Sequence, residues 1–241
     1  MIFLFTDFGV TGPYVGQVQA VLARAAPGVS VIELMSDLPA FDIKAAAYLL
    51  PVYCAQARPG DVVLAVVDPG VGSARRGVVV EADGVWFVGP DNGLLSLIIR
   101  RAKSVRAWAV PAASPQASAT FHGRDVFAPV AGRLAIGQAH DYSQIDPNTL
   151  DRPDWPDDWP AIIYVDGYGN ALTGLRVTTV QAEFRLTLGG PRVPVFRTFS
   201  DAKPGEAFVY VNSNGLWEFA VNGGNAAQLL GLKPGVPIYR V

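Results

Sequence analysis

Short apolar runs alternate with helical patterns over the first 110 residues, and this alternation constrains the fold most strongly. The segments IFLFT (2–6) and DVVLAVVD (61–68) are continuously apolar, as strands buried on both faces of a sheet are. Apolar residues recur at helical spacing over 13–26, and further helices are expected over 42–57, which contains Pro51, and over 94–102. The sequence therefore predicts an α/β fold with a mainly parallel sheet.

Four further strands are expected in this part of the chain, at 29–35, 77–82, 85–88 and 104–110. The dipeptide Asp83-Gly84 lies between two of them and predicts a hairpin turn. A helix is expected after His122, because Phe127, Val130 and Leu134 follow at helical spacing.

The pattern breaks over residues 141–160. The run DPNTLDRPDWPDDWP contains four prolines and shows neither a helix nor a strand period, which is typical of a linker. The segments AIIYVDGYGN, EFRLTLGG, EAFVYVNSNG and LWEFAVNGG that follow are rich in β-formers and are separated by Gly and Asn turns. The sequence thus predicts an α/β domain over 1–140, a linker over 141–160 and a smaller all-β domain over 161–241.

Charge and cysteine content exclude several classes of protein. Of the 241 residues 50% are hydrophobic and 17% charged, and the net charge of −2 provides no basic field for a nucleic acid. Cys54 is the single cysteine, so an intramolecular disulfide is excluded, and no Cys/His cluster has the spacing of a metal site. No segment has the pattern of a signal peptide or a membrane span, so a cytoplasmic protein without a membrane partner is expected.

The tetrapeptide Thr6-Asp-Phe-Gly9 resembles the magnesium-binding motif of protein kinases. A kinase would place a Gly-rich loop, a lysine strand and a His-Arg-Asp loop before it, whereas the similar His122-Gly-Arg-Asp125 lies far downstream. A phosphohydrolase with Asp-x-Asp after its first strand is also disfavoured, because Gly9 occupies the place of the second acid. Asp7 therefore requires another explanation.

Three acids follow expected strands, and ligands of open parallel sheets bind at the carboxyl ends of strands. Asp7, Asp68 and Asp91 could therefore meet in one crevice. Each also has a structural interpretation, since Asp7 and Asp91 could cap the following helices and Asp68 could begin the turn at Pro69-Gly70.

The loop DPGVGSARR (68–76) supplies the next candidates. Its Gly-x-Gly is not a dinucleotide-binding fingerprint, because no helical pattern follows it. One of Arg75 and Arg76 is expected to hold a carboxylate or a developing anion and the other to be solvated. His122 has aromatic and Gly neighbours and is either a site residue or a structural histidine, whereas His140 is expected at the surface. No Gly-x-Ser-x-Gly elbow of an ordinary hydrolase is present.

In the β domain, Asp166, Tyr168 and Asn170 are brought together by a Gly-containing turn. An aromatic face and an amide suit an adenine-like base, although an ordinary β-turn explains the same pattern. Ser213 beside an Asn-Gly turn, and Glu218 in the strand after it, are further candidates.

Six ordered segments together resemble the S-adenosyl-L-methionine hydroxide adenosyltransferases, relatives of the fluorinase and chlorinase enzymes. The segments are TDFG, VDPGVGSARR, GPDNGLL, FHGRDVFAPVA, VDGYGN and VNSNGLWEFAVNGGNAA, and they span nearly the whole chain. The resemblance implies hydrolysis of S-adenosyl-L-methionine to adenosine and methionine, with no cofactor beside the substrate. It also implies a barrel-like second domain and a homotrimer with sites shared between subunits.

The resemblance assigns a role to each candidate residue. It implies a catalytic set of Asp68, Arg75 and His122, here called the Asp-Arg-His set, which acts on the attacking water. Asp7 would hold the ribose hydroxyls. The other expected substrate-binding residues are Tyr168 and Asn170 for adenine, Asp166 and Ser213 for the methionine ammonium and carboxylate, and Glu218 in the same group. A halide-using adenosyltransferase and a non-catalytic binding module remain the alternatives.

Overall fold

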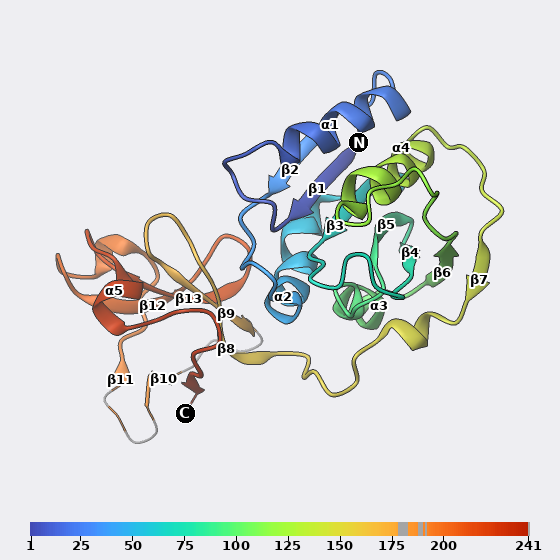
Figure 1. Ribbon diagram of the computed structural model, residues 1–241. Helices are drawn as coiled ribbons and strands as arrows, with labels where there is room; N and C mark the ends of the chain where they lie inside the picture. The colour runs from blue at the N-terminus through green and yellow to red at the C-terminus, as the bar shows by residue number, and fades with distance from the viewer. Residues whose placement is uncertain (178–182, 188–189, 191, 241) are drawn as a thin grey trace. The chain divides into compact units, whose positions relative to one another are not determined.

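A computed structural model of the chain describes residues 1–177, 183–187, 190 and 192–240 (Figure 1). The chain divides into two compact units, Met1–Pro153 and Asp154–Val241. None of the helices in the described residues is both long and apolar enough to span a membrane.

The first unit is built on a seven-stranded sheet with the order β2-β1-β3-β5-β4-β6-β7. Its strands are β1 (Ile2–Thr6), β2 (Val31–Met35), β3 (Val62–Val66), β4 (Gly77–Ala82), β5 (Val85–Pro90), β6 (Val105–Val110) and β7 (Ser143–Ile145). The pairs within β2-β1-β3-β5 are parallel, and β4, β6 and β7 add antiparallel pairs. Asp83 and Gly84 both have positive φ in the β4–β5 turn, as a two-residue hairpin requires.

Helices cover both faces of this sheet. They are α1 (Tyr14–Ala25), α2 (Ile43–Tyr53), α3 (Ser96–Arg101) and α4 (Ala128–Ala135), with short helical turns at Cys54–Gln56, Gly123–Phe127 and Pro147–Leu150. Helices α1 and α4 pack together on one face, and α2 and α3 lie on the other (Figure 1). Val18 and Leu22 of α1 are fully buried against β1 and β3, so the sheet's continuous apolar runs are explained by helices on both sides.

Two expected helices differ in detail from the sequence pattern. The helix expected over 42–57 ends as α2 at Tyr53 and continues as a 3₁₀ turn, two residues after Pro51, whose ring removes a helical N–H donor. The helix expected after His122 begins as a π-helix, Gly123–Phe127, before it becomes α4. Residues 141–160 contain β7, the turn Pro147–Leu150 and the first residues of β8.

In its described residues the second unit is an antiparallel β structure of a four-stranded sheet, β12-β13-β9-β8, and a three-stranded sheet, β11-β10-β14. Its elements are β8 (Trp159–Val165), β9 (Ala171–Arg176), β10 (Phe184–Arg185), β11 (Arg192–Val193), a 3₁₀ turn (Phe199–Asp201), β12 (Ala207–Val211), β13 (Leu216–Val221), α5 (Ala226–Leu230) and β14 (Tyr239–Arg240). Residues 188–189 of the predicted segment EFRLTLGG lie outside the described residues. The predicted fold class, a parallel-rich α/β part followed by an all-β part, is confirmed.

Candidate active site

Two of the three strand-end acids line one cavity. Thr6 and Val66 are paired ends of β1 and β3, so Asp7 and Asp68 follow at the same edge of the sheet. Both line a cavity of about 330 Å³, within the usual range of about 300–1,000 Å³ for small-molecule sites. Asp91 is not among the lining residues, and its carboxylate accepts a bond from Arg76 Nε at 2.7 Å. Neither Asp7 nor Asp91 caps a helix, since α1 and α3 begin after Pro13 and Leu95.

The loop after β3 brings the Asp-Arg-His set together. Arg75 Nε donates to Asp68 Oδ1 at 2.8 Å, and Arg75 Nη2 donates to Asp68 Oδ2. The same Nη2 lies 3.0 Å from His122 Nδ1. The side chains of Arg75 and Asp68 are only 11% and 6% exposed, so this bidentate pair is shielded from water. Arg76 has an exposed side chain that pairs with Asp91.

The contact with Arg75 defines the state of the His122 ring. A guanidinium has donors and no acceptor, so Nδ1 of His122 must accept and its proton lies on Nε2. Burial lowers the pKa of His122, and the positive charge of Arg75 lowers it further against the opposing charges of Asp68 and Asp125. His122 is therefore neutral at neutral pH, with an N–H donor at Nε2.

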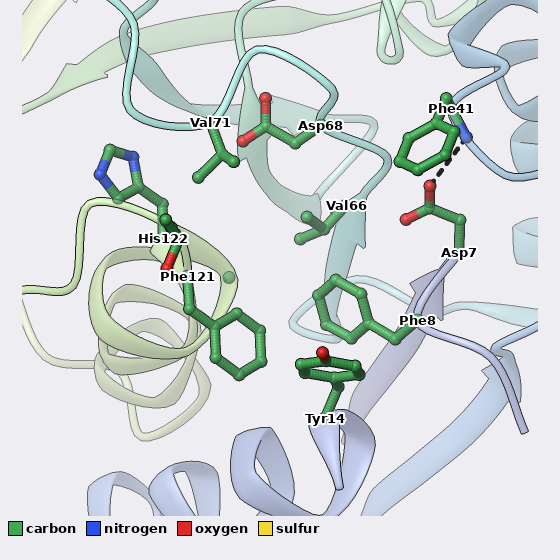
Figure 2. Close-up of a pocket in the computed structure, with 11 residues that line it drawn as sticks. Asp7, Phe8, Tyr14, Phe41, Val66, Asp68, Val71, Phe121 and His122 are labelled. Atoms are coloured by element: carbon green, nitrogen blue, oxygen red, sulfur yellow. Dashed lines mark hydrogen bonds between the residues drawn. The ribbon is translucent and has the colours of Figure 1, made fainter. Parts of the chain in front are cut away.

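Asp7 lies on the other side of the cavity and keeps one oxygen available. Its Oδ2 accepts from the backbone N–H of Phe41 at 3.0 Å, and its other oxygen is turned toward the cavity (Figure 2). Burial raises the pKa of Asp7 and the charge of Asp68 adds to this, while the Phe41 N–H acts in the opposite direction. Phe41 has a φ of 64° and a 73% exposed side chain at the cavity rim.

Aromatic rings form the remaining wall. Phe121 meets Phe8 and Tyr14 edge to face, with ring centroids 5.5 Å apart in each pair (Figure 2). These aromatic residues were not identified as site residues from the sequence, although Phe8 and Phe121 directly follow or precede ones that were. An apolar wall opposite a few polar groups is the usual composition of a small-molecule site.

The two loops that carry the Asp-Arg-His set contact each other closely. Gly72 has a φ of 80°, and a Cβ there would lie 2.7 Å from the carbonyl oxygen of Ala119. Only glycine fits this position without strain. The 68–76 loop is thus packed against the segment that leads to His122.

Three of the other candidate residues line a cavity of about 520 Å³ in the second unit, whereas Ser213 and Glu218 do not. Asp166, Tyr168 and Asn170 line it, together with Tyr210 and others. Asp166 Oδ1 accepts from the backbone N–H groups of Tyr168 and Asn170 at 2.9 and 2.8 Å, and Asp166 Oδ2 accepts from Asn170 Nδ2 at 3.0 Å. The Tyr168 side chain is 83% exposed, so its ring is available for stacking.

Glu218 is buried, and its carboxylate is engaged at both oxygens. It accepts from Tyr210 Oη at 2.5 Å and from Asn212 Nδ2 at 2.7 Å. Asn212 Oδ1 in turn accepts from the backbone of the turn that carries the exposed Ser213. Glu218 therefore supports the Ser213 turn and does not line the cavity. Within the described residues no group of three His, Cys, Asp or Glu side chains is placed to hold a metal ion.

Two models of known domain families match this chain. The model of the SAM hydroxide adenosyltransferase N-terminal domain matches residues 2–144, and that of the C-terminal domain matches residues 160–239. This chain belongs to the SAM hydroxide adenosyltransferase family. The resemblance of the six ordered segments is thereby confirmed.

Individual relatives agree with this membership. An (R)-S-adenosyl-L-methionine hydrolase of Thermus thermophilus is 43% identical, over 98% of each chain. A fluorinase of Actinoplanes sp. is more distant, at 24% identity over 99% of this chain and 96% of its own. The crystal structure of an uncharacterized conserved protein from Thermotoga maritima superposes with a TM-score of 0.83 at 29% identity, covering 100% of this chain and 99% of that one.

Proposed function

We propose that this protein hydrolyses S-adenosyl-L-methionine to adenosine and L-methionine. Water or hydroxide attacks the ribose 5′ carbon, the bond from that carbon to sulfur breaks, and its electron pair leaves with the neutral thioether of methionine. The water proton is released. The observation that carries the proposal is the Asp-Arg-His set at the wall of a cavity whose other side holds Asp7. The named activity of the Thermus relative supports the choice of substrate.

The proposed work of the Asp-Arg-His set follows from the difficulty of the reaction. A neutral thioether leaves a sulfonium without needing a proton, so no general acid is required at the leaving group. Water, however, is a poor nucleophile and hydroxide is scarce at neutral pH. Fixed donors stabilise developing hydroxide character, and positioning of a reactant can supply about 7–11 kcal/mol in favourable cases.

The hydrogen bonds within the set suggest a division of roles. Because His122 Nδ1 already accepts from Arg75, its Nε2–H can only donate, which suits it to orient a water oxygen. The carboxylate of Asp68 is the group in the set that can accept the proton. Arg75 holds both partners, and its charge favours hydroxide over water.

The remaining candidates are proposed to hold the substrate. A carboxylate accepts from both ribose hydroxyls at once, which suits the cavity-facing oxygen of Asp7. Tyr168 would stack on adenine and Asn170 would bond its edge, with Asp166 and Ser213 serving the methionine ammonium and carboxylate. Glu218 would act indirectly, through the Ser213 turn.

The test is an incubation of purified protein with S-adenosyl-L-methionine, followed by chromatography, with and without added fluoride, chloride or bromide. Adenosine and methionine in equal amounts, unaffected by halide, are expected. A 5′-halo-adenosine would instead identify a halide-using enzyme related in activity to the fluorinase. Calorimetric binding without any methionine release over long incubations would identify a binding module.

The family resemblance also supports a homotrimer in which neighbouring subunits share sites. The chain mass is 25.6 kDa, so light scattering at working concentration distinguishes a trimer from a monomer. Full activity at the monomer mass would contradict shared sites.

A further inference from the structure

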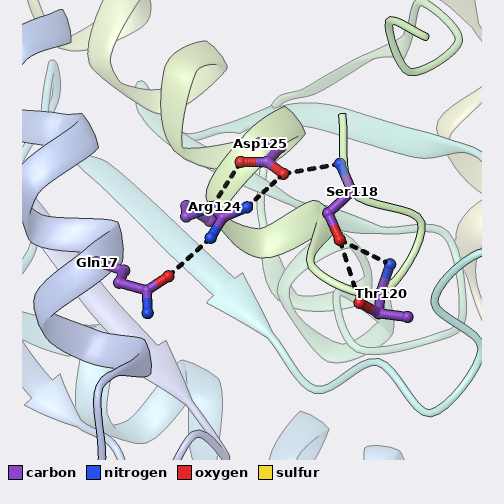
Figure 3. A network of polar contacts seen from close by, with 5 residues as sticks. All are labelled: Gln17, Ser118, Thr120, Arg124 and Asp125. Atoms are coloured by element: carbon purple, nitrogen blue, oxygen red, sulfur yellow. Dashed lines mark hydrogen bonds and ion pairs between the residues drawn. The ribbon is translucent and has the colours of Figure 1, made fainter. Parts of the chain in front are cut away.

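The two residues after Gly123 form an ion pair outside the cavity. Arg124 Nε donates to Asp125 Oδ1 at 2.6 Å, and Arg124 Nη2 donates to Asp125 Oδ2 at 2.8 Å (Figure 3). Both residues lie in the π-helix that begins directly after His122. Such π-helical turns occur frequently at functional sites. Neither residue lines the cavity that holds Asp7 and Asp68.

Asp125 is hydrogen-bonded to the segment 118–122, which leads to His122. Its Oδ2 accepts from the backbone N–H of Ser118 at 2.8 Å, and Ser118 Oγ accepts from the N–H of Thr120 at 3.3 Å (Figure 3). The backbone N–H of Asp125 donates to the carbonyl of Phe121 at 3.1 Å. Ser118 and Phe121, at or near the two ends of the segment 118–122, are therefore bound to one residue.

Arg124 ties the same segment to the cavity wall. Its Nη1 donates to Gln17 Oε1 of α1 at 2.7 Å, and its guanidinium carbon lies 5.0 Å from the centroid of the Phe121 ring. Helix α1 begins at Tyr14, which contacts Phe121 inside the cavity. Arg124 thus contacts both α1 and the segment 118–122, which carry Tyr14 and Phe121 of the aromatic wall.

We propose that Arg124 and Asp125 are positioning residues, which hold the segment 118–122 so that His122 meets Arg75 and the attacking water. This inference deepens the proposed function and rests on it. A misplacement of about 1 Å by a residue remote from the chemistry can cost a hundredfold in rate, so a fixed segment matters for His122.

The charge of Asp125 gives the pair a second effect. The charged groups that act on His122 are Arg75 and Asp68 from the loop after β3 and Asp125 from the π-helix. Asp125 raises the pKa of His122, against the lowering by burial and by Arg75. We therefore expect removal of this negative charge to move the titration of His122 to lower pH.

Three variants and one matched control test the proposal. Asp125→Asn removes the charge, Arg124→Gln removes the ion pair, and Gln17→Ala releases the pair from α1 without changing any charge. The control is Arg106→Gln, because Arg106 also pairs with a carboxylate, that of Glu81, and lies 5.6 Å from an aromatic centroid, that of Trp108. Each variant is checked for wild-type circular dichroism before kinetics.

The expected result separates position from charge. Asp125→Asn and Arg124→Gln lower kcat about 10- to 100-fold while KM for S-adenosyl-L-methionine changes less than about threefold, and Gln17→Ala lowers kcat by a smaller factor. Arg106→Gln leaves both unchanged. In proton NMR, the variant His140→Gln leaves His122 as the single histidine, so its signal can be assigned. The titration of His122 is expected at lower pH in Asp125→Asn and unmoved in Gln17→Ala.

Two results would overturn the proposal. One is wild-type kcat in both Asp125→Asn and Arg124→Gln, together with an unmoved His122 titration in Asp125→Asn. The other is a raised KM and a lowered melting temperature with unchanged kcat, again with an unmoved titration. That result would show that the pair only stabilises the fold. The NMR titration needs no turnover, so failure of the proposed hydrolysis is distinguishable from failure of this inference.

Discussion

The polar residues of the first unit and those of the second unit are held in different ways. In the first, Arg75 joins Asp68 and His122 through side-chain bonds that are largely shielded from water. In the second, Asp166 is held within its own turn, by two backbone N–H groups and the side chain of Asn170, and Tyr168 is almost fully exposed. The first arrangement is complete without a substrate, whereas the second leaves an exposed aromatic ring that we propose to stack on the substrate. We therefore expect changes in the first to affect turnover and changes in the second to affect binding.

The largest effect is expected for the Asp-Arg-His set. Arg75→Ala and His122→Ala should each lower kcat about 10²–10⁴-fold, the range of a positioned acid–base group, with nearly intact affinity for S-adenosyl-L-methionine. Arg75→Lys should also fail, because an ammonium cannot reproduce the bidentate fork on Asp68. The matched control is Arg76→Ala, whose side chain pairs with Asp91 outside the cavity. Wild-type turnover in both alanine variants would show that the set does not carry the chemistry.

Asp7 lies in the first unit but is proposed to bind substrate. It therefore tests whether a residue beside the Asp-Arg-His set can affect binding and not turnover. Asp7→Ala should weaken binding of adenosine and S-adenosyl-L-methionine alike by on the order of 3 kcal/mol, or roughly a hundredfold in Kd, because both carry the same ribose diol. Calorimetry with adenosine measures this directly. Unchanged adenosine affinity would limit Asp7 to its bond with the Phe41 backbone.

The pH dependence of turnover reports the state of His122. Burial and the charge of Arg75 lower its pKa, so the neutral ring that accepts from Arg75 persists below the ordinary histidine range. As pH falls through this lowered pKa, a proton on Nδ1 faces the guanidinium and kcat should drop, by about tenfold for each further pH unit. A kcat profile that stays flat through the pH at which NMR shows His122 to titrate would contradict a role for neutral His122.

The smallest effect is expected in the second unit. Tyr168→Ala should raise KM and weaken adenosine binding about tenfold, since stacking of a base on an aromatic ring contributes about 1–3 kcal/mol, while kcat stays close to wild type. Tyr168→Phe keeps the ring and serves as the control. A fall in kcat without a change in binding would remove the distinction between the two units.

Much of the first unit could be predicted from local sequence. Apolar runs that must be covered on both faces indicate buried strands, and the ends of β1 and β3 place Asp7 and Asp68 at one edge. Asp91 shows the limit of that reasoning. It also follows a strand, but its side chain is held by Arg76, a contact between residues fifteen positions apart that no local pattern reveals.

The finer features depend on contacts between distant segments. The direction of the hydrogen bond at His122 depends on Arg75, which is 47 positions away. The sequence predicts Glu218 as a substrate-binding residue, and it gives no sign that Tyr210 and Asn212 donate to its two oxygens. The positive φ of Phe41 has no residue signature, because glycine and asparagine are the usual markers of that conformation.

Hydrolysis in water enriched in ¹⁸O tests the central claim most directly, with both products analysed by mass spectrometry. Attack of water at the ribose 5′ carbon predicts one ¹⁸O atom in adenosine, at the 5′ oxygen, and none in methionine. Arg75→Ala should give the same labelled product at a much lower rate. Label in the amino-acid product, or cleavage without any adenosine, would place the attack at another carbon of the sulfonium and contradict the account.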